Sequence, residues 1–282
     1  MKPMILFLFL AAALAGCQNA PVTGRNQLML VPESQAIEAS NGAYQEALST
    51  EARAGRLNNE PAQSARVRKI TSRLVAQAIR YRPETENWDW QVAVIDDPQT
   101  LNAWCMAGGK MAIYTGIIEK LSLTDDEIAQ VMGHEIAHAL AKHTAERMST
   151  AVASDVVLQI GAALLGNRGV AGNLTMQAAA LATTVGVQLP NSRKQEAEAD
   201  RIGIELAAKA GYDPHAAPRL WQKMVAATGS AGKSDFLSTH PAGEKRAETL
   251  AGLVPAMLPF YQADTPRPEH PLKTASMQAR AR

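Results

Sequence analysis

The sequence has few aromatic residues, no block of one charge and no internal repeats. Aromatic residues make up 5% of the 282 positions, while alanine is abundant, and this composition favours helices over sheets. The formal net charge is +1, which argues against nucleic acid as the main partner because no basic block is available to neutralise phosphates. Hydrophobic residues make up 46% of the chain, as in ordinary globular proteins with a buried core.

Long apolar runs are also missing. Residues 150–189 are rich in Ala and Gly and predict two helices broken near residues 166–169. Polar residues interrupt both runs before they reach the length of a membrane span. Core packing is the favoured interpretation of this region, and an amphipathic hairpin that covers the active site or touches lipid is the alternative.

The N-terminus predicts a targeting segment. A short basic start is followed by an apolar run over residues 4–14 and then by Leu-Ala-Gly-Cys, which ends at Cys17. The run has the shape of a secretory signal peptide and is too short to remain as a membrane helix. Leu-Ala-Gly-Cys resembles the bacterial lipobox, which implies cleavage before Cys17 and lipidation of its thiol. An ordinary signal peptide that happens to contain Cys is the alternative.

This interpretation divides the start of the chain into a signal peptide (1–16) and a lipidated Cys17 with a flexible tether (17–32). Gln18 after the cysteine points to the outer membrane, by resemblance to bacterial sorting rules. With Cys17 lipidated, Cys105 has no disulfide partner, and it is predicted to be a small buried residue.

The pattern H-E-x-x-H occurs at His134, Glu135 and His138. Residues four apart leave the same face of a helix, so the two imidazoles are placed to bind one Zn²⁺. Glu135 lies beside them and is placed to act as the general base for a water that the metal activates. A chance pentapeptide in an amphipathic helix is the alternative.

The helix that carries this pattern is well signalled. Residues 124–127 form a capping box, with Thr124 as N-cap and Glu127 reaching back to it, and apolar residues follow at helical spacing. Gly133 in mid-helix costs about 1 kcal/mol relative to Ala, so a close neighbour is expected there. Further helices are predicted over 33–54, 61–81, 116–121 and 214–227.

Strands are predicted just before this helix. Residues 88–95 alternate as in a strand, and residues 102–113 predict two short strands joined across Gly108-Gly109. An edge strand in this place could bind an extended peptide through main-chain hydrogen bonds. An ordinary hairpin is an equally good interpretation. The candidate substrate-binding residues are Asn102, Ala103, Gly108 and Gly109.

A second chemical cluster lies at residues 196–200. A zinc site with two His ligands needs one more protein ligand, commonly a carboxylate. Glu196 and Asp200 share a helix face, whereas Glu198 points away by about 160°. This favours Glu196 as the ligand, with Asp200 hydrogen-bonded to a ligand imidazole. Without the H-E-x-x-H pattern, a solvated helix would be the better interpretation.

Four blocks in this order resemble metallopeptidase family forty-eight, which includes the prenyl-protein (CAAX) endopeptidases, the HtpX proteases, mitochondrial Oma and BepA-type proteases. The blocks are N-A-W-C-M-A-G-G-K-M-A-I-Y-T-G (102–116), H-E-I-A-H (134–138), E-A-E-A-D (196–200) and H-P-A-G-E-K-R (240–246). The resemblance implies a zincin-like α+β fold, mainly α with a small β-sheet. The expected metallopeptidase domain is 33–254, and a Pro-rich, poorly ordered tail is expected over 255–282.

The resemblance also implies residue roles. One Zn²⁺ per chain would be bound by His134, His138 and Glu196, with Glu135 as general base and Asp200 supporting a ligand histidine. His240 would either stabilise the oxyanion or, as a fourth ligand, keep the enzyme latent, and Arg246 would form ion pairs near the site. Three histidines match no motif: His143, His215 and His270.

The implied activity is a zinc endopeptidase of the bacterial cell envelope, anchored by lipid to the outer membrane and facing the periplasm. Its substrates would be unfolded or misassembled envelope polypeptides. The alternative is a chaperone-like assembly factor with a latent or non-essential protease site. The intact Glu135 argues against that alternative, because this carboxylate has no structural duty in a site with three other ligands.

Overall fold

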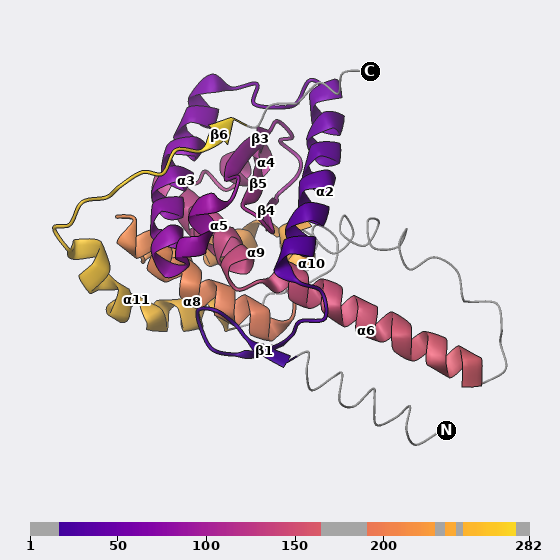
Figure 1. Cartoon of the computed structure of the whole chain (residues 1–282). Coiled ribbons are helices and arrows are strands. Elements are labelled where there is room, and N and C mark those ends of the chain that lie inside the picture. Colours follow the sequence, from indigo (N-terminus) through magenta and orange to yellow (C-terminus); the bar gives the residue numbers. More distant parts are fainter. Residues whose placement is uncertain (1–16, 165–190, 229–234, 241–244, 275–282) are drawn as a thin grey trace.

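The computed structural model describes residues 17–164, 191–228, 235–240 and 245–274. The predicted signal peptide, much of the 150–189 region and the last eight positions of the predicted tail lie outside these ranges. Within them, helices surround a small sheet (Figure 1), so the predicted α+β class is confirmed. The helices are α2 (Glu33–Arg53), α3 (Pro61–Tyr81), η1 (Pro83–Asn87), α4 (Thr115–Lys120), α5 (Asp125–Leu140), α6 (His143–Leu164), α8 (Arg193–Lys209), α9 (Ala216–Thr228), α10 (Asp235–Thr239) and α11 (Arg246–Gln262).

The main sheet has the strand order β4-β5-β3-β6, formed by β3 (Gln91–Ile95), β4 (Ala103–Met106), β5 (Lys110–Tyr114) and β6 (Lys273–Thr274). The pair β4–β5 is antiparallel and is joined across Gly108-Gly109 as predicted, and β3 pairs in parallel with β5 and β6. Both glycines have φ near +80°, which residues with a Cβ rarely adopt. β4 is an edge strand of this sheet, because it stands at one end of the strand order.

The two faces of this sheet pack against different helices. Val92, Val94 and Met111 face the larger core with α3 and α5, whereas Ala93 and Ala112 face a smaller core with α2. This alternation follows from the two-residue period of a strand. Further helices, α8, α9 and α11, pack beyond α5, so that α5 lies buried between the sheet and the helical layer.

The N-terminal segment is more structured than the predicted tether. β1 (Cys17–Asn19) and β2 (Asn26–Leu28) form an antiparallel hairpin that lies beside α8 and the start of α6 (Figure 1). Gln27 is buried and donates to the carbonyl of Ala141 at 2.6 Å. Polar contacts with distant residues fix this segment to the domain. Such contacts leave no periodic pattern in the sequence.

The Pro-rich stretch after residue 254 also differs from its expectation. Helix α11 continues to Gln262 through two prolines, and residues 273–274 add β6 to the sheet. Proline in a helix removes a hydrogen bond and clashes with the preceding turn. Burial of Leu250, Val254 and Met257 on one face of α11 outweighs that cost.

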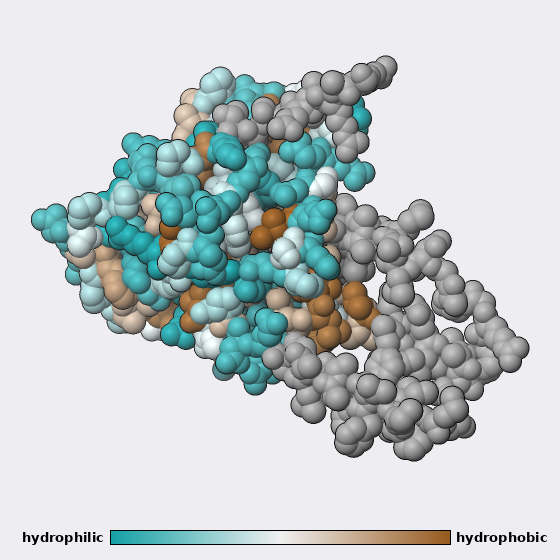
Figure 2. All heavy atoms as spheres, viewed as in Figure 1, coloured by the Kyte–Doolittle hydropathy of each residue, from teal (hydrophilic) through white to brown (hydrophobic). Residues whose placement is uncertain are grey.

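Most of the face shown in Figure 2 is hydrophilic. Among the described residues the exposed large hydrophobic side chains are Leu30, Val225, Phe260 and Tyr261. None of the described helices is long and apolar enough to cross a membrane.

A backbone-to-backbone contact joins α5 to α8. A Cβ at Gly203 would lie 2.8 Å from the backbone nitrogen of His134, and a Cβ at Gly133 would lie 2.9 Å from the carbonyl oxygen of Gly203. The close neighbour expected at Gly133 is therefore the backbone of α8. Because α5 and α8 carry the two chemical clusters, this contact determines how far apart those clusters lie.

Gly203→Ala is expected to destabilise the protein by about 1–3 kcal/mol, because the new methyl group presses on backbone that has no side chain to move. The measurement is urea unfolding of the metal-free protein. Gly252→Ala is the matched control, since a Cβ there meets nothing within 4 Å, and it should be neutral or stabilising by up to ~1 kcal/mol. Equal stability of Gly203→Ala and the wild type would show that the two helices can separate at no cost.

Candidate metal centre

The H-E-x-x-H residues lie in the buried middle of α5. Thr124 accepts from the backbone nitrogen of Glu127, whose side chain accepts from the backbone nitrogen of Thr124, so the predicted capping box begins the helix. His134 and His138 leave the same face, and their Nε2 atoms lie 3.0 Å apart. Both side chains are at least nine-tenths buried.

Helix α8 supplies the carboxylates. A second capping box, between Ser192 and Gln195, begins the helix immediately before Glu196. Glu196 Oε2 lies 3.3 Å from His134 Nε2, and Glu196 Oε1 lies 3.4 Å from His138 Nε2. Asp200 Oδ1 lies 3.0 Å from His134 Nδ1. The predicted division between the two carboxylates is thus present in the geometry, with Glu196 among the ligand atoms and Asp200 behind His134.

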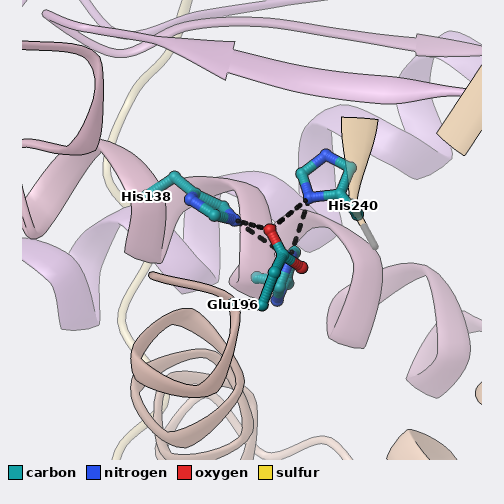
Figure 3. A group of neighbouring side chains, drawn as sticks. His138, Glu196 and His240 are labelled. Atoms are coloured by element: carbon teal, nitrogen blue, oxygen red, sulfur yellow. Dashed lines mark hydrogen bonds and ion pairs between the residues drawn. The ribbon is translucent and has the colours of Figure 1, made fainter. Parts of the chain in front are cut away.

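His240 completes the group from a third direction. It follows the short helix α10 and stacks on Phe236 with ring centroids 4.4 Å apart. The backbone nitrogen of Asn191 donates to the carbonyl of Thr239, and Asn191 Nδ2 lies 3.3 Å from His240 Nδ1. His240 Nδ1 lies 3.0 Å from Glu196 Oε1 and 3.3 Å from His134 Nε2. Figure 3 shows His138 and His240 converging on Glu196 from opposite sides.

Four ligand atoms converge in this way: those of His134, His138, Glu196 and His240 all lie within 4.8 Å of one another and are buried. Three ring nitrogens and one carboxylate oxygen thus lie close together in a buried place. Hydrogen bonds between them can satisfy only some of their lone pairs. A divalent cation satisfies all of them at once. The donor set therefore fits a metal ion.

The family model of peptidase family M48 matches residues 61–254. The chain belongs to peptidase family M48. M48 peptidases are metal-dependent proteases, so the predicted recognition is confirmed, together with the coarse assignment as a metallopeptidase.

Curated relatives agree with the M48 assignment. The chain is 40% identical over 170 residues to mitochondrial metalloendopeptidase OMA1 of Arabidopsis thaliana, covering 59% of this chain and 32% of that protein. It is 27% identical over 259 residues to metalloprotease LoiP of Escherichia coli, covering 88% of this chain and 95% of LoiP. A beta-barrel assembly-enhancing protease of Vibrio cholerae is 33% identical over 159 residues, with 52% and 31% covered. The chain spans 32% and 47% of the length of the first two OMA1 relatives.

The charges in the M48 site hold it together without a metal. Burial lowers the pKa of His134, but Glu196 and Asp200 outweigh burial and raise it to about 9. Burial raises the pKa of Glu196, and its histidine partners bring it far below the usual range. Burial keeps the pKa of His138 well below its ordinary value. A cation that binds His134 therefore displaces a proton.

Arg246 lies under the two carboxylates. It donates from Nη1 to Glu196 at 2.7 Å and from Nε and Nη2 to Asp200 at 2.7 and 2.6 Å, and it stacks over Trp221 at 3.7 Å. The predicted ion pairs near the site are thus present. The guanidinium of Arg246 offsets the negative charge of the two buried carboxylates.

Glu135 faces the pocket from α5. Its Oε1 lies 3.4 Å from His240 Nε2, is buried, and has no hydrogen-bond partner among the described residues. Burial raises the pKa of its carboxyl, while His240 and His134 oppose that rise. A buried carboxylate oxygen that makes no hydrogen bond among the described residues is suited to accept a proton from a substrate or water.

The edge strand β4 lies across the same pocket. Asn102, Ala103 and Cys105 line it together with Glu135 and His138. The glycines at the β4–β5 turn do not line it; Gly108 and Gly109 approach Ile37 and Trp90 instead. The structure thus brings the first two candidate substrate-binding residues to the site and leaves the two glycines in a structural role. Cys105 is buried as predicted, and burial raises the pKa of its thiol.

Two residues at this site were missed by the sequence analysis. Arg147 of α6 lines the pocket beside β4; burial lowers its pKa to about 10, and its Nε has no hydrogen-bond partner among the described residues. Nδ1 of His143 lies 2.8 Å from Nδ1 of His138. The only sequence signal for either is its place within ten residues of His138. The other unassigned histidines, His215 and His270, are in neither the ligand group nor the pocket lining.

Proposed function

We propose that this protein is a zinc-dependent endopeptidase of the bacterial cell envelope that hydrolyses unfolded or misassembled envelope polypeptides. The observation that carries the proposal is the convergence of four buried ligand atoms beside Glu135, whose buried Oε1 makes no hydrogen bond among the described residues. Nitrogen-rich donor sets with one carboxylate suit zinc, whereas magnesium and calcium prefer oxygen donors throughout.

In the proposed reaction, His134, His138 and Glu196 would hold a Zn²⁺ that would supply the Lewis acidity needed to make water a nucleophile near neutral pH. Glu135 takes the proton of the attacking water and later delivers it to the leaving amine. An extended substrate would add to the outer edge of β4, which pairs with no described strand except β5, and main-chain hydrogen bonds there would place its scissile bond over α5. This arrangement needs no particular side chain in the substrate, as suits a protease of misfolded chains.

The position of His240 supports a resting state. A catalytic zinc site keeps one position open for water or substrate beside three protein ligands. Here His240 Nδ1 lies 3.0 Å from Glu196 Oε1, where it would act as a fourth ligand of a bound Zn²⁺, while His240 Nε2 faces Glu135. We propose that this arrangement is the latent form, and that displacement of His240 opens the site. In the rival role, His240 stabilises the oxyanion. That role requires the His240 ring to remain near the substrate after the ring has left the ligand group.

His240→Ala is expected to raise the hydrolysis of casein by the metal-loaded protein, because it opens the fourth position and frees Glu135. The measurement is initial rate against substrate concentration. Phe236→Leu removes the ring that is stacked on His240 and that also packs against Trp221 and His134. It keeps the His240 side chain, so it is the matched variant and should raise activity less. A fall in kcat for His240→Ala would instead make His240 a catalytic residue and would end the latency proposal.

The envelope location is supported by the predicted lipid anchor and by LoiP, a bacterial metalloprotease that the chain matches over most of its length. We propose that the N-terminus is tethered at Cys17 to the outer membrane and that the domain faces the periplasm. Cys17→Ser is expected to move the protein from the membrane fraction to the soluble fraction of cells. Cys105→Ser is the control and should leave the distribution unchanged, since Cys105 is buried.

The test of the proposed activity is the zinc content of the purified protein, measured beside casein hydrolysis. One zinc per chain with activity that a chelator removes and zinc restores is the expected result. A protein that binds no zinc would refute the proposal. The second candidate, a chaperone-like assembly factor, is favoured only by the place of His240 in the ligand group, and it predicts zinc binding without turnover.

A further inference from the structure

His138 has a second partner besides the ligand group. Its Nε2 belongs to that group, and its Nδ1 lies 2.8 Å from Nδ1 of His143. A neutral imidazole that binds a metal through Nε2 carries its proton on Nδ1. His138 Nδ1 is then the donor of this hydrogen bond, and His143 Nδ1 is the acceptor.

The tautomer of His143 follows from that acceptor role. With Nδ1 accepting, the neutral ring carries its proton on Nε2, which lies 3.1 Å from Glu198 Oε2. His143 is fully buried, so both bonds are shielded from bulk solvent. Glu198, which the helical spacing directs away from the ligand face of α8, therefore reaches the metal centre indirectly through His143.

Glu198 is itself held by the N-terminal hairpin. It accepts from the hydroxyl of Thr23 and, at 2.6 Å, from Nε of Arg25, and both residues lie between β1 and β2. Arg25 also donates two hydrogen bonds to Glu146 of α6, at 2.7 and 2.6 Å. The guanidinium thus clamps α6, which carries His143, to α8, which carries Glu198.

We propose that His143 is a positioning residue for the metal ligand His138, and that Arg25 of the N-terminal hairpin completes the site by holding Glu198 against His143. Arg25 of the hairpin contacts Glu198, Glu198 contacts His143, and His143 contacts His138. It orients one imidazole of the centre from a segment that is more than a hundred residues distant in the chain. The inference rests on the proposed metal site, and its test keeps the two apart.

The test compares Zn²⁺ affinity, measured by competition with a chelating dye at constant pH, among full-length variants. His143→Leu, which removes the acceptor for His138, is expected to weaken Zn²⁺ binding about 10–100-fold. His143→Asn retains an acceptor and a donor on a short side chain and should restore affinity close to the wild-type value. Arg25→Leu should weaken binding by a smaller factor, because Glu198 remains but is no longer clamped.

A structural role alone would lower stability without changing the metal site, so two further readouts separate the possibilities. The absorption bands of the Co²⁺-loaded protein should shift in His143→Leu. They should not shift in Thr85→Val, a control that loses a buried 2.7 Å hydrogen bond to the carbonyl of Arg82. Melting temperatures of the metal-free proteins report the purely structural cost of each change.

The outcomes are distinct. If the wild type binds Zn²⁺ and His143→Leu binds it equally well, the positioning role of His143 is refuted while the proposed function stands. If His143→Leu binds weakly but Arg25→Leu matches the wild type, the hairpin has no part in the site. If the wild type binds no Zn²⁺, the proposed function fails and this inference fails with it.

Discussion

Glu135→Gln is expected to lower the peptidase activity about 10²–10⁴-fold, the usual contribution of a general base, while the zinc content stays at the wild-type level. Glu135 is outside the group of four ligand atoms, so the substitution removes the proton acceptor and keeps the metal. Glutamine has nearly the same shape, and it replaces a buried carboxylate oxygen that makes no hydrogen bond among the described residues. Stability should therefore be unchanged or slightly higher.

Glu127→Gln is the matched control for this experiment. It lies on the same helix and is equally buried, it can still close the capping box, and it loses only the 2.7 Å ion pair with Lys223. Its activity should stay close to that of the wild type. Full activity in Glu135→Gln would remove this residue from the mechanism and leave water activation to another group.

The same variant separates the protease from the assembly factor. In a strain that lacks the protein, Glu135→Gln should fail to restore normal envelope assembly if hydrolysis is the main function. Complete rescue by a variant that binds zinc but does not hydrolyse casein would favour the chaperone-like role.

The second large effect is expected from Arg246→Met, which should destabilise the metal-free protein by about 3–5 kcal/mol. Removing one partner of a buried ionic cluster leaves the remaining charges uncompensated. Glu196 and Asp200 are both buried, and Arg246 makes three hydrogen bonds to them. The methionine side chain can still pack against Trp221, so the loss of stability reports the lost charge, its hydrogen bonds and its cation–π contact with Trp221.

Zinc should recover part of that stability, because a cation bound at Glu196 supplies positive charge where the guanidinium is lost, and because any ligand that binds only the folded state stabilises it. The measurement is urea unfolding with and without Zn²⁺. Arg219→Met is the control, since Arg219 pairs with Asp213 at the surface with its side chain 50% exposed, and it should change stability by less than ~1 kcal/mol. Equal stability of Arg246→Met and the wild type without metal would mean that the two carboxylates share a proton.

Much of the site follows from local sequence patterns. The positions of His134, Glu135 and His138 on one helix follow from the spacing of the motif and from the capping box at Thr124, both of which act within a few residues. The alternation of the strands and the Gly108-Gly109 turn are local in the same sense. For these elements, backbone geometry within a short segment determines which side chains share a face.

The tail and the N-terminal segment were harder to predict because their stability comes from distant contacts. The prolines of α11 signal a break, but burial of Leu250 and Val254 against the rest of the core outweighs them. Residues 17–28 show no periodic pattern, and their order comes from side chains such as Arg25, whose partners lie more than 120 positions away.

By itself, the sequence determined the helix that carries His134, Glu135 and His138, the carboxylates that share a face of the later helix, and the family. Only the tertiary structure decided the part played by His143. The pattern around residues 138–146 contains no glycine to end a helix, and in one continuous helix His143 would lie about 140° around the axis from His138. Instead α5 ends at Leu140, Lys142 adopts φ 60°, and α6 begins at His143. That turn, together with the close approach of α8 at Gly203, brings His143 and Glu198 behind His138, because packing between helices determines contacts that spacing along one helix does not specify.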